Sequence, residues 1–398
     1  MTTASLSRGW NLRGVWLMAF AHGASDLYSG ILPFVLFYVV ALAKLPPWYQ
    51  GALAVVWYLT SSVAQPAVGA YSDRHGRWWF LPLSVALTAI GVSAASATSS
   101  LAVLIPCVVL GGLGSAIMHP EAGRYSALLG GTRRASAISI YQVGGQIGYG
   151  LGPYLAAVLL VHAGGGAALL MIIPGLLAAL AVAVVLPGFA RDADARAPRH
   201  TAGDALGRVD HVAIGLLVAS TALRYLAASS FAFYLPNLLT ARGFPLTATG
   251  AVATAFIVAA AVGLYAGGAG ADHLGARRVA VLGLVTSVPA LLAGLVLPGA
   301  AGLGALLLGS ALLAVQNAPG VTLAQEHLPR HLGTALGLMN GVAFGIGSLG
   351  VAVIGIVVTR FGPEAGLVTA AFAALPAAVP YLVLRSPHAR EEEPVRGA

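Results

Sequence analysis

The stretch Gly69-Ala-Tyr-Ser-Asp73-Arg74-His-Gly76-Arg77 decides the fold, because a similar polar stretch follows 199 residues later (268 − 69 = 199). The second stretch is Gly268-Ala-Gly-Ala-Asp272-His273-Leu-Gly275-Ala-Arg277. Each follows a long apolar run and precedes another, as a short loop between two membrane helices does. One loop at the same position in each half indicates a duplicated membrane bundle, the architecture of secondary transporters.

Composition excludes most other classes of protein. Of the 398 residues, 58% are hydrophobic and 9% are charged, whereas soluble domains have about 25% charged residues. The basic residues behind the net charge of +8 are scattered among apolar segments, so we expect no nucleic-acid partner. The single cysteine, Cys107, lies in an apolar run and predicts neither a disulfide framework nor a thiol metal cluster. One lysine beside twenty arginines indicates a bacterial chain from a GC-rich genome.

Apolar runs of about 20 residues, the length that crosses a bilayer, predict twelve transmembrane helices. Their approximate limits are 13–41, 50–71, 79–98, 101–127, 135–161, 165–187, 210–239, 247–270, 278–297, 300–327, 332–359 and 365–385. A long polar break separates two sets of six. We therefore predict an all-α membrane protein with two pseudo-symmetric six-helix bundles. The N-terminal bundle is 1–187, the cytoplasmic linker 188–209, and the C-terminal bundle with a short cytoplasmic tail 210–398.

Lys and Arg counts in the loops predict the orientation, because basic residues accumulate on the cytoplasmic side. With the N-terminus inside, three basic residues fall in outer loops: Lys44, Arg242 and Arg360. Sixteen fall on the inner side: Arg8, Arg13, Arg74, Arg77, Arg133, Arg134, Arg191, Arg196, Arg199, Arg208, Arg277, Arg278, Arg330, Arg385, Arg390 and Arg396. Both termini are expected in the cytoplasm.

A few ionisable residues fall inside the predicted spans, where each needs a partner or a function because a charge there costs at least ~2.5–3.5 kcal/mol. Asp26 lies near the middle of the first span, and His22 is one helical turn earlier on the same face. Adding the repeat offset to 26 gives 225, next to Arg224 in the seventh span. We predict that Asp26 and Arg224 pair along the substrate path. A purely structural ion pair is the alternative.

The fourth span carries Met118-His119-Pro120-Glu121-Ala-Gly-Arg124. Pro120 is expected to kink the helix, and Glu121 and Arg124 can pair along one face. Glu121 is a candidate for proton exchange, with His119 and Arg124 as candidate substrate ligands. Glu326, at the matching end of the tenth span, is either a further proton carrier or a structural carboxylate. Five methionines and no clustered His or Cys residues predict no metal site.

The fifth span combines small residues with amides. Gly144, Gly148 and Gly152, followed by Pro153, have the four-residue spacing of a close helix-packing face. Gln142 and Gln146 lie one turn apart and can hydrogen-bond a substrate. The eleventh span repeats the pattern with Asn340-Gly341 and three further glycines: Gly345, Gly347 and Gly350.

The repeated loop Gly-x-x-x-Asp-Arg-x-Gly-Arg resembles the loop signature of the major facilitator superfamily. Three further segments resemble its fosmidomycin-resistance family: His22-x-x-x-Asp26, His119-Pro120-Glu121-x-x-Arg124 and Gln142-Val-Gly144-Gly145. The run Ala324-Gln325-Glu326-x-Leu-Pro329 in the second half is similar too. Gly148-x-x-x-Gly152-Pro153 resembles an exporter motif of the superfamily, although Ala156-Ala157 replace two of its glycines. The resemblance implies a proton-driven drug exporter of the inner membrane.

We therefore expect a proton antiporter, functional as a monomer, that exports a small anionic or phosphonate-like drug or metabolite by alternating access. Asp26, Glu121 and Glu326 are the candidate proton carriers, and no cofactor besides protons is expected. The candidate substrate ligands are His22, His119, Arg124, Gln142, Gln146, Arg224, Tyr225 and Asn340. The candidate switch loops comprise Gly69, Asp73, Arg74, Gly76, Arg77, Gly268, Asp272, Gly275 and Arg277. A proton-coupled importer of an organic anion and a lipid-handling transporter are the alternatives. An enzyme is disfavoured because no nucleophile set, metal-ligand spacing or phosphate loop is present.

Overall fold

The computed structural model describes residues 10–65, 67, 68, 71, 77–196, 210–328, 335 and 338–384. Throughout these residues the secondary structure is helical, with no strand. The chain divides into two compact units, which are described separately. Unit 1 comprises Met1–Ala202 with Leu239–Thr254, and unit 2 comprises Gly203–Leu238 with Ala255–Ala398. Helix α9 therefore contributes its first residues to unit 1 and the remainder to unit 2.

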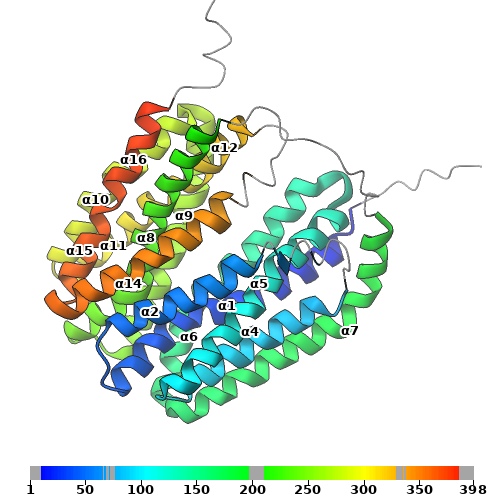
Figure 1. Cartoon of the computed structure of the whole chain (residues 1–398), viewed down its shortest axis with the longest axis horizontal. Helices are drawn as coiled ribbons and strands as arrows, with labels where there is room; N and C mark the ends of the chain where they lie inside the picture. Colours follow the sequence, from blue (N-terminus) through cyan, green and yellow to red (C-terminus); the bar gives the residue numbers. More distant parts are fainter. Residues whose placement is uncertain are drawn as a thin grey trace, which may run out of the picture. The chain divides into compact units, whose positions relative to one another are not determined.

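Unit 1 is built around α1, which runs alongside α6 over most of its length (Figure 1). Its helices and turns are α1 (Leu12–Leu42), α2 (Trp48–Tyr58), η1 (Leu59–Val63), α4 (Phe80–Ser96), α5 (Leu101–Gly130), η2 (Gly131–Arg133), α6 (Arg134–Ala167), η3 (Ala168–Met171) and α7 (Ile172–Arg196). α6 bends at Gly164, whose φ is 61°. α7 continues past the predicted limit at 187 into the predicted linker, because Ala and Arg are good helix formers.

Helices α8 (His211–Ala241) and α9 (Leu246–Leu274) open the second half of the chain. The remaining elements of unit 2 are α10 (Ala276–Val296), α11 (Gly299–Ala314), α12 (Asn317–His327), η4 (Leu338–Val342), α14 (Ala343–Phe361), α15 (Pro363–Phe372) and α16 (Ala374–Val383). α11 and α12 together form one span, interrupted at Val315 and Gln316, and α15 and α16 form another.

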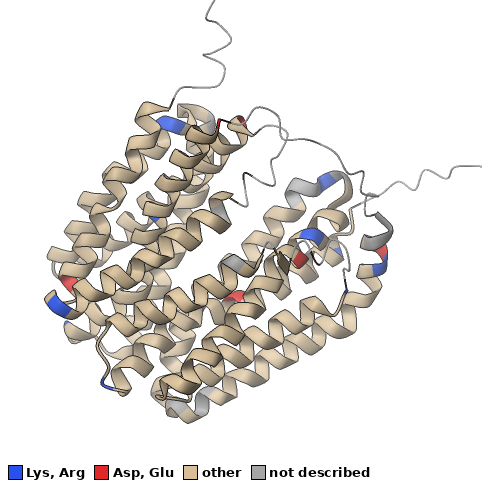
Figure 2. Cartoon of the chain, in the orientation of Figure 1, with Lys and Arg blue, Asp and Glu red and all other residues tan. Residues whose placement is uncertain are grey.

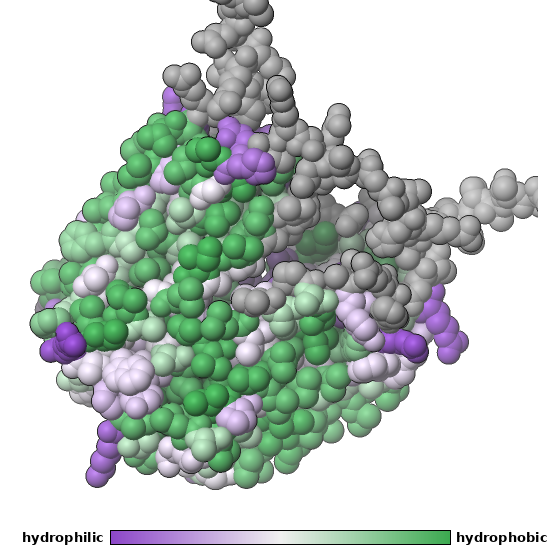
Figure 3. Space-filling model, viewed as in Figure 1, coloured by the Kyte–Doolittle hydropathy of each residue, from purple (hydrophilic) through white to green (hydrophobic). Residues whose placement is uncertain are grey.

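Ten stretches of the described chain are long and apolar enough to cross a membrane. α4 is a shorter apolar helix at the predicted third span, and α2 with η1 covers most of the second, whose end lies partly outside the described residues. Charged residues lie mainly near helix ends, with few along the helix middles (Figure 2). Hydrophobic residues cover most of the helical surface in view, as lipid contact requires (Figure 3). The prediction of an all-α, twelve-helix membrane fold is confirmed.

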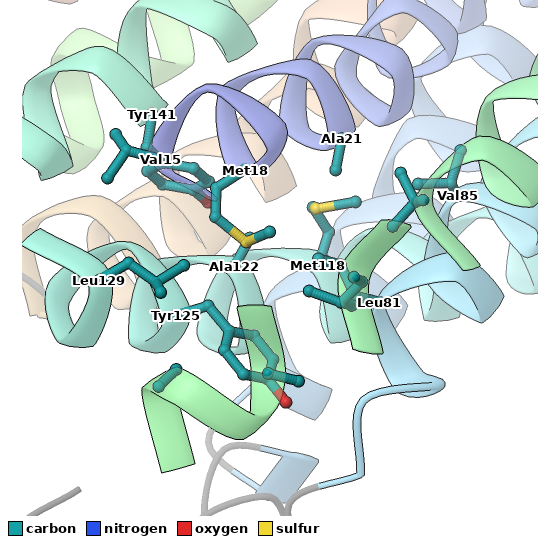
Figure 4. Packing of buried hydrophobic residues seen from close by; sticks show 14 of the residues in the cluster. Val15, Met18, Ala21, Leu81, Val85, Met118, Ala122, Tyr125, Leu129 and Tyr141 are labelled. Carbon is teal, nitrogen blue, oxygen red and sulfur yellow. The ribbon is translucent and has the colours of Figure 1, made fainter. Parts of the chain in front are cut away.

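The core of unit 1 joins helices from across its sequence. Met18 of α1 and Met118 and Tyr125 of α5 meet Leu81 of α4, and all four are fully buried (Figure 4). Tyr141 of α6 closes the cluster and is 4% exposed. Because α1, α5 and α6 share this core, polar side chains next to it are held at fixed separations.

The same close glycine contact occurs once within each unit. A Cβ on Gly148 of α6 would lie 2.0 Å from the carbonyl oxygen of Gly23 in α1. A Cβ on Gly347 of α14 would lie 2.3 Å from the carbonyl oxygen of Ala222 in α8. Both partners differ by the repeat offset (347 − 148 = 199; 222 − 23 = 199). The same backbone approach is therefore built twice, which is the expected signature of duplicated six-helix bundles.

Candidate functional site

His22 and Asp26 of α1 form an ion pair inside unit 1. Nε2 of His22 lies 3.0 Å from Oδ2 of Asp26, and the two side chains are 4% and 16% exposed. The i, i+4 spacing on one helix places both groups on the same face. Asp26 therefore has a partner within its own helix. Its predicted pairing with Arg224 would join the two units and remains a prediction.

The opposite side of the His22 ring is fixed by α6. Nδ1 of His22 donates a hydrogen bond to the carbonyl oxygen of Tyr141 at 2.9 Å, and the two rings stack with centroids 4.1 Å apart. With the Nδ1 hydrogen committed to that carbonyl, the His22–Asp26 contact needs one further proton. Loss of this proton would leave an imidazole lone pair facing a carboxylate oxygen. The pair is thus a proton-binding unit.

His119 of α5 completes what we call the His22 cluster: His22, Asp26, His119 and Tyr141. Its ring meets the ring of His22 edge-on, with centroids 5.2 Å apart. Nδ1 of His119 lies 3.4 Å from the Tyr141 hydroxyl, and Nε2 lies 3.5 Å from Oγ of Ser115. Three helices therefore contribute polar groups to one cluster within an apolar core.

Gly145 of α6 makes room for this arrangement. A Cβ at this position would lie 2.3 Å from Cε1 and 2.6 Å from both ring nitrogens of His22. Side chains essentially never approach so closely, so only glycine lets the His22 ring reach the Tyr141 carbonyl. Gly145 belongs to the Gln-Val-Gly-Gly segment, and glycine is needed there because the His22 ring occupies the space that a side chain would fill.

Glu121 and Arg124 lie further along α5. Oε2 of Glu121 is 3.7 Å from Nη2 of Arg124, and the side chains are 0% and 19% exposed. The Arg124 guanidinium also lies over the ring of Tyr125, 4.5 Å from its centroid. The expected i, i+3 pairing is present in the structure, whereas the proposed proton exchange at Glu121 remains a prediction.

Arg224 of α8 is a buried cation of unit 2. The residue is 4% exposed, and its guanidinium carbon lies 3.9 Å from the ring centroid of Tyr225. Nε and Nη2 are buried without a hydrogen-bond partner among the described residues. Arg224 forms no ion pair within that part of the chain. A buried guanidinium with unused donors is a candidate site for an anion.

The other predicted ligands and carriers differ in exposure. Gln142 and Gln146 are exposed on α6, and Glu326 is exposed in the last turn of α12. Tyr225 is half-buried and packs edge-on against Phe344 of α14, with ring centroids 4.6 Å apart. The side chain of Asn340 lies outside the described residues.

The predicted switch loops are described only in part. Gly69, Asp73, Arg74, Gly76 and the side chain of Asp272 lie outside the described residues. Arg77 is exposed before α4, and Gly268 lies within α9. Gly275 caps the start of α10 with a φ of 85°, and Arg277 follows in the first turn. A role for either loop in switching remains a prediction.

Sequence reasoning missed three polar residues of unit 2 and one of unit 1. Tyr141, Thr221, Gln316 and Tyr381 are buried, and each forms side-chain or backbone-carbonyl contacts described here. The adjacent amides Gln316-Asn317 inside an apolar span were a visible signal. Tyr141, Thr221 and Tyr381 gave none, because single hydroxyls are common in buried helices.

The comparisons with known proteins agree with this architecture. Residues 15–214 and 217–398 match the family model described as Major Facilitator Superfamily. The chain belongs to the major facilitator superfamily. This transporter is 31% identical over 316 residues to the fosmidomycin resistance protein of Escherichia coli (strain K12), covering 77% of each chain. It is 27% identical over 368 residues to the uncharacterized MFS-type transporter YfnC of Bacillus subtilis (strain 168), covering 89% of each chain.

Among solved structures, the transporter is similar to a bacterial homologue of the human lysosomal transporter Spinster in its inward-facing, unoccupied conformation. The TM-score is 0.79 at 15% sequence identity, covering 95% of this chain and 97% of the other. These findings confirm the resemblance to the fosmidomycin-resistance family. They also confirm that the chain is a multi-pass membrane transporter and not an enzyme.

Proposed function

We propose that this transporter exports a small anionic compound, phosphonate-like in its charged group, in exchange for protons. The main observation in support of this proposal is that the two units differ at equivalent positions. Unit 1 has the ionisable Asp26, whereas the repeat offset leads to Tyr225 beside the buried Arg224 in unit 2 (225 − 26 = 199). One unit thus holds a group that can gain and lose a proton, and the other holds a permanent cation.

The His22 cluster supports proton coupling. A carboxylate and an imidazole 3.0 Å apart share a proton most stably, and both can titrate when water reaches them. An antiporter needs such a group, because it must take up a proton from one side and release it to the other. Glu121 is a second candidate, since it is fully buried beside Arg124.

Arg224 supports the anionic substrate. Holding a cation that has no ion-pair partner among the described residues in an apolar bundle costs free energy, which an incoming anion offsets. A planar guanidinium matches the oxygens of a phosphonate in geometry. The Arg224 guanidinium packs over the Tyr225 ring, and its Nε and Nη2 have no hydrogen-bond partner among the described residues, so both can donate to an anion. The name of the Escherichia coli relative, a fosmidomycin resistance protein, supports drug efflux.

The proposal includes a place in the bacterial inner membrane with both termini cytoplasmic. It further includes protons as the coupling ion without another cofactor, contact with membrane lipids and activity as a monomer. An importer would carry its substrate in the opposite direction under the same proton gradient, so vesicle orientation separates the two functions.

Everted membrane vesicles test the proposal. An inside-acid pH gradient should drive accumulation of a radiolabelled phosphonate by the wild-type protein, and a protonophore should abolish it. Asp26→Asn and Arg224→Gln should each remove the driven accumulation. The matched controls Glu364→Gln and Arg360→Gln make the same charge changes at exposed helix ends and should retain it. Accumulation that persists after the gradient collapses would contradict proton coupling.

A further inference from the structure

The break between α11 and α12 places a buried amide beside the Arg224 region. Gln316 occupies this break and is 0% exposed. Its Nε2 donates hydrogen bonds to Oγ1 of Thr221, at 3.1 Å, and to the hydroxyl of Tyr381. We call Thr221, Gln316 and Tyr381 the Gln316 cluster, which joins α8, α12 and α16. Interrupted helices commonly line transporter binding sites, because their polar groups are free for a ligand.

The Gln316 cluster and Arg224 belong to one polar region of unit 2. Thr221 lies three residues before Arg224 on α8, hence on a neighbouring part of the same helix face. Asn317, next to Gln316, has its Nδ2 at 3.5 Å from the Tyr225 hydroxyl. The guanidinium of Arg224 packs over the ring of the same Tyr225.

Three buried atoms of this region have no hydrogen-bond partner among the described residues. They are Nε and Nη2 of Arg224, which are donors, and Oε1 of Gln316, which is an acceptor. Buried polar atoms are usually paired, so an unpaired set with two donors and one acceptor indicates a complementary ligand. The complement of this set is an anionic group together with an O–H or N–H donor.

The duplicated architecture does not require the Gln316 cluster. The repeat offset leads from Gln316 to Ile117 and from Tyr381 to Val182 in unit 1 (316 − 199 = 117; 381 − 199 = 182). The same offset leads from Thr221 to His22 (221 − 199 = 22), so unit 1 has apolar side chains at two of the three equivalent positions and the polar His22 at the third. The polar character of Gln316 and Tyr381 is therefore confined to unit 2. The charge of Arg224 is confined to unit 2 as well, because its equivalent in unit 1 is the buried, neutral Ser25 (224 − 199 = 25).

We propose that Gln316 determines specificity by accepting a hydrogen bond from a donor group of the anion that Arg224 binds. The substrate class is then an anion with a hydroxyl or N–H group a short distance from its charge. This inference rests on the proposed function, because it takes the anion site at Arg224 as given.

Three phosphonates that differ in one group test the inference on the purified full-length protein by isothermal titration calorimetry. 2-Hydroxyethylphosphonate has a donor, 2-methoxyethylphosphonate has an acceptor alone, and ethylphosphonate has neither. The wild-type protein should bind the hydroxyl compound about five- to tenfold more tightly than either of the others, as one added hydrogen bond to a buried acceptor predicts.

Gln316→Met keeps the side-chain length and removes the acceptor. It should bring the three affinities to within about twofold of one another, while ethylphosphonate still binds. Gln50→Met is the matched control, because Gln50 of α2 is also buried, at 1% exposure, and its Oε1 has no hydrogen-bond partner in the described part of the chain. This control should keep the preference for the hydroxyl compound.

Equal binding of the three compounds by the wild-type protein would overturn the inference, as would a preference for the methoxy compound. A preference that survives Gln316→Met would overturn it too. If Gln316→Met does not fold, the wild-type ratios and the Gln316→Asn variant decide. Gln316→Asn withdraws the acceptor and should weaken the preference. Failure of the proposed function looks different: no phosphonate binds, or Arg224→Gln binds all three as the wild type does.

Discussion

Replacing Gly145 with alanine is a sharp test of how the His22 cluster is held. The new Cβ would lie 2.3 Å from Cε1 of His22 if nothing moved. Contacts below about 3 Å do not persist, so the ring must move away from α6. That movement lengthens the 2.9 Å hydrogen bond to the Tyr141 carbonyl and changes the 3.0 Å contact with Asp26.

The free energy of this change has opposing parts. Overpacking a core position costs about 1–3 kcal/mol, and loss of a neutral hydrogen bond costs about 0.5–1.5 kcal/mol. The helix propensity of alanine returns about 1 kcal/mol. The balance is a modest loss of stability, while the proton site is displaced. Since a displacement of 1 Å in a reacting group can cost about 100-fold, proton-driven transport should fall about tenfold or more.

The assay compares proton-driven flux in everted vesicles with thermal unfolding of the purified protein. Gly166→Ala is the control at the far end of α6, beyond the bend at Gly164, because a Cβ there meets nothing within 4 Å. That control should keep its flux and gain slightly in stability. A Gly145→Ala protein with wild-type flux would refute the argument that proton-driven transport depends on the position of the His22 ring against Gly145.

The remaining predictions address the carboxylates, the loops and the topology. Glu121→Gln should abolish proton-driven flux while calorimetry still detects phosphonate binding, and normal flux would leave Glu121 as a structural partner of Arg124. Asp73→Asn should reduce transport about tenfold without loss of membrane insertion, as removal of a charge-assisted contact predicts. Asp272→Asn should be milder, since His273 replaces the arginine of the first loop; full activity in both variants would make the loops simple connectors. Reporter fusions after residues 200 and 398 should report cytoplasm and one near Lys44 the outside, so a periplasmic signal at 200 would contradict the predicted orientation.

Much of the fold could be predicted from hydropathy, because a bilayer demands apolar helices of fixed length. The span 13–41 became α1 at Leu12–Leu42, for example, since nothing in that run breaks a helix except Pro33, which a membrane helix tolerates. The end of α7 was harder to predict from hydropathy. Its last residues are polar but favour helix, so hydropathy stops at 187 whereas the helix continues to Arg196.

The site was predictable only where residues lie on one helix. His22 with Asp26, and Glu121 with Arg124, follow from helical spacing. The contacts of His22 with Tyr141 and of Gln316 with Thr221 and Tyr381 join residues 65 to 119 positions apart. No periodic pattern encodes such contacts, because they depend on how helices pack. Gly145 illustrates this point, since its need for glycine appears only when His22 is placed against it.

Proton release on substrate binding tests the central claim most directly. A phosphonate added to the purified transporter in weakly buffered solution should release protons, measured with a pH-sensitive dye, because antiport requires proton loss to accompany binding. Arg224→Gln should release none because it does not bind the anion, and Asp26→Asn should bind the anion without release. Binding with no release by the wild-type protein, or unchanged release by Asp26→Asn, would contradict the division between a proton site in unit 1 and an anion site in unit 2.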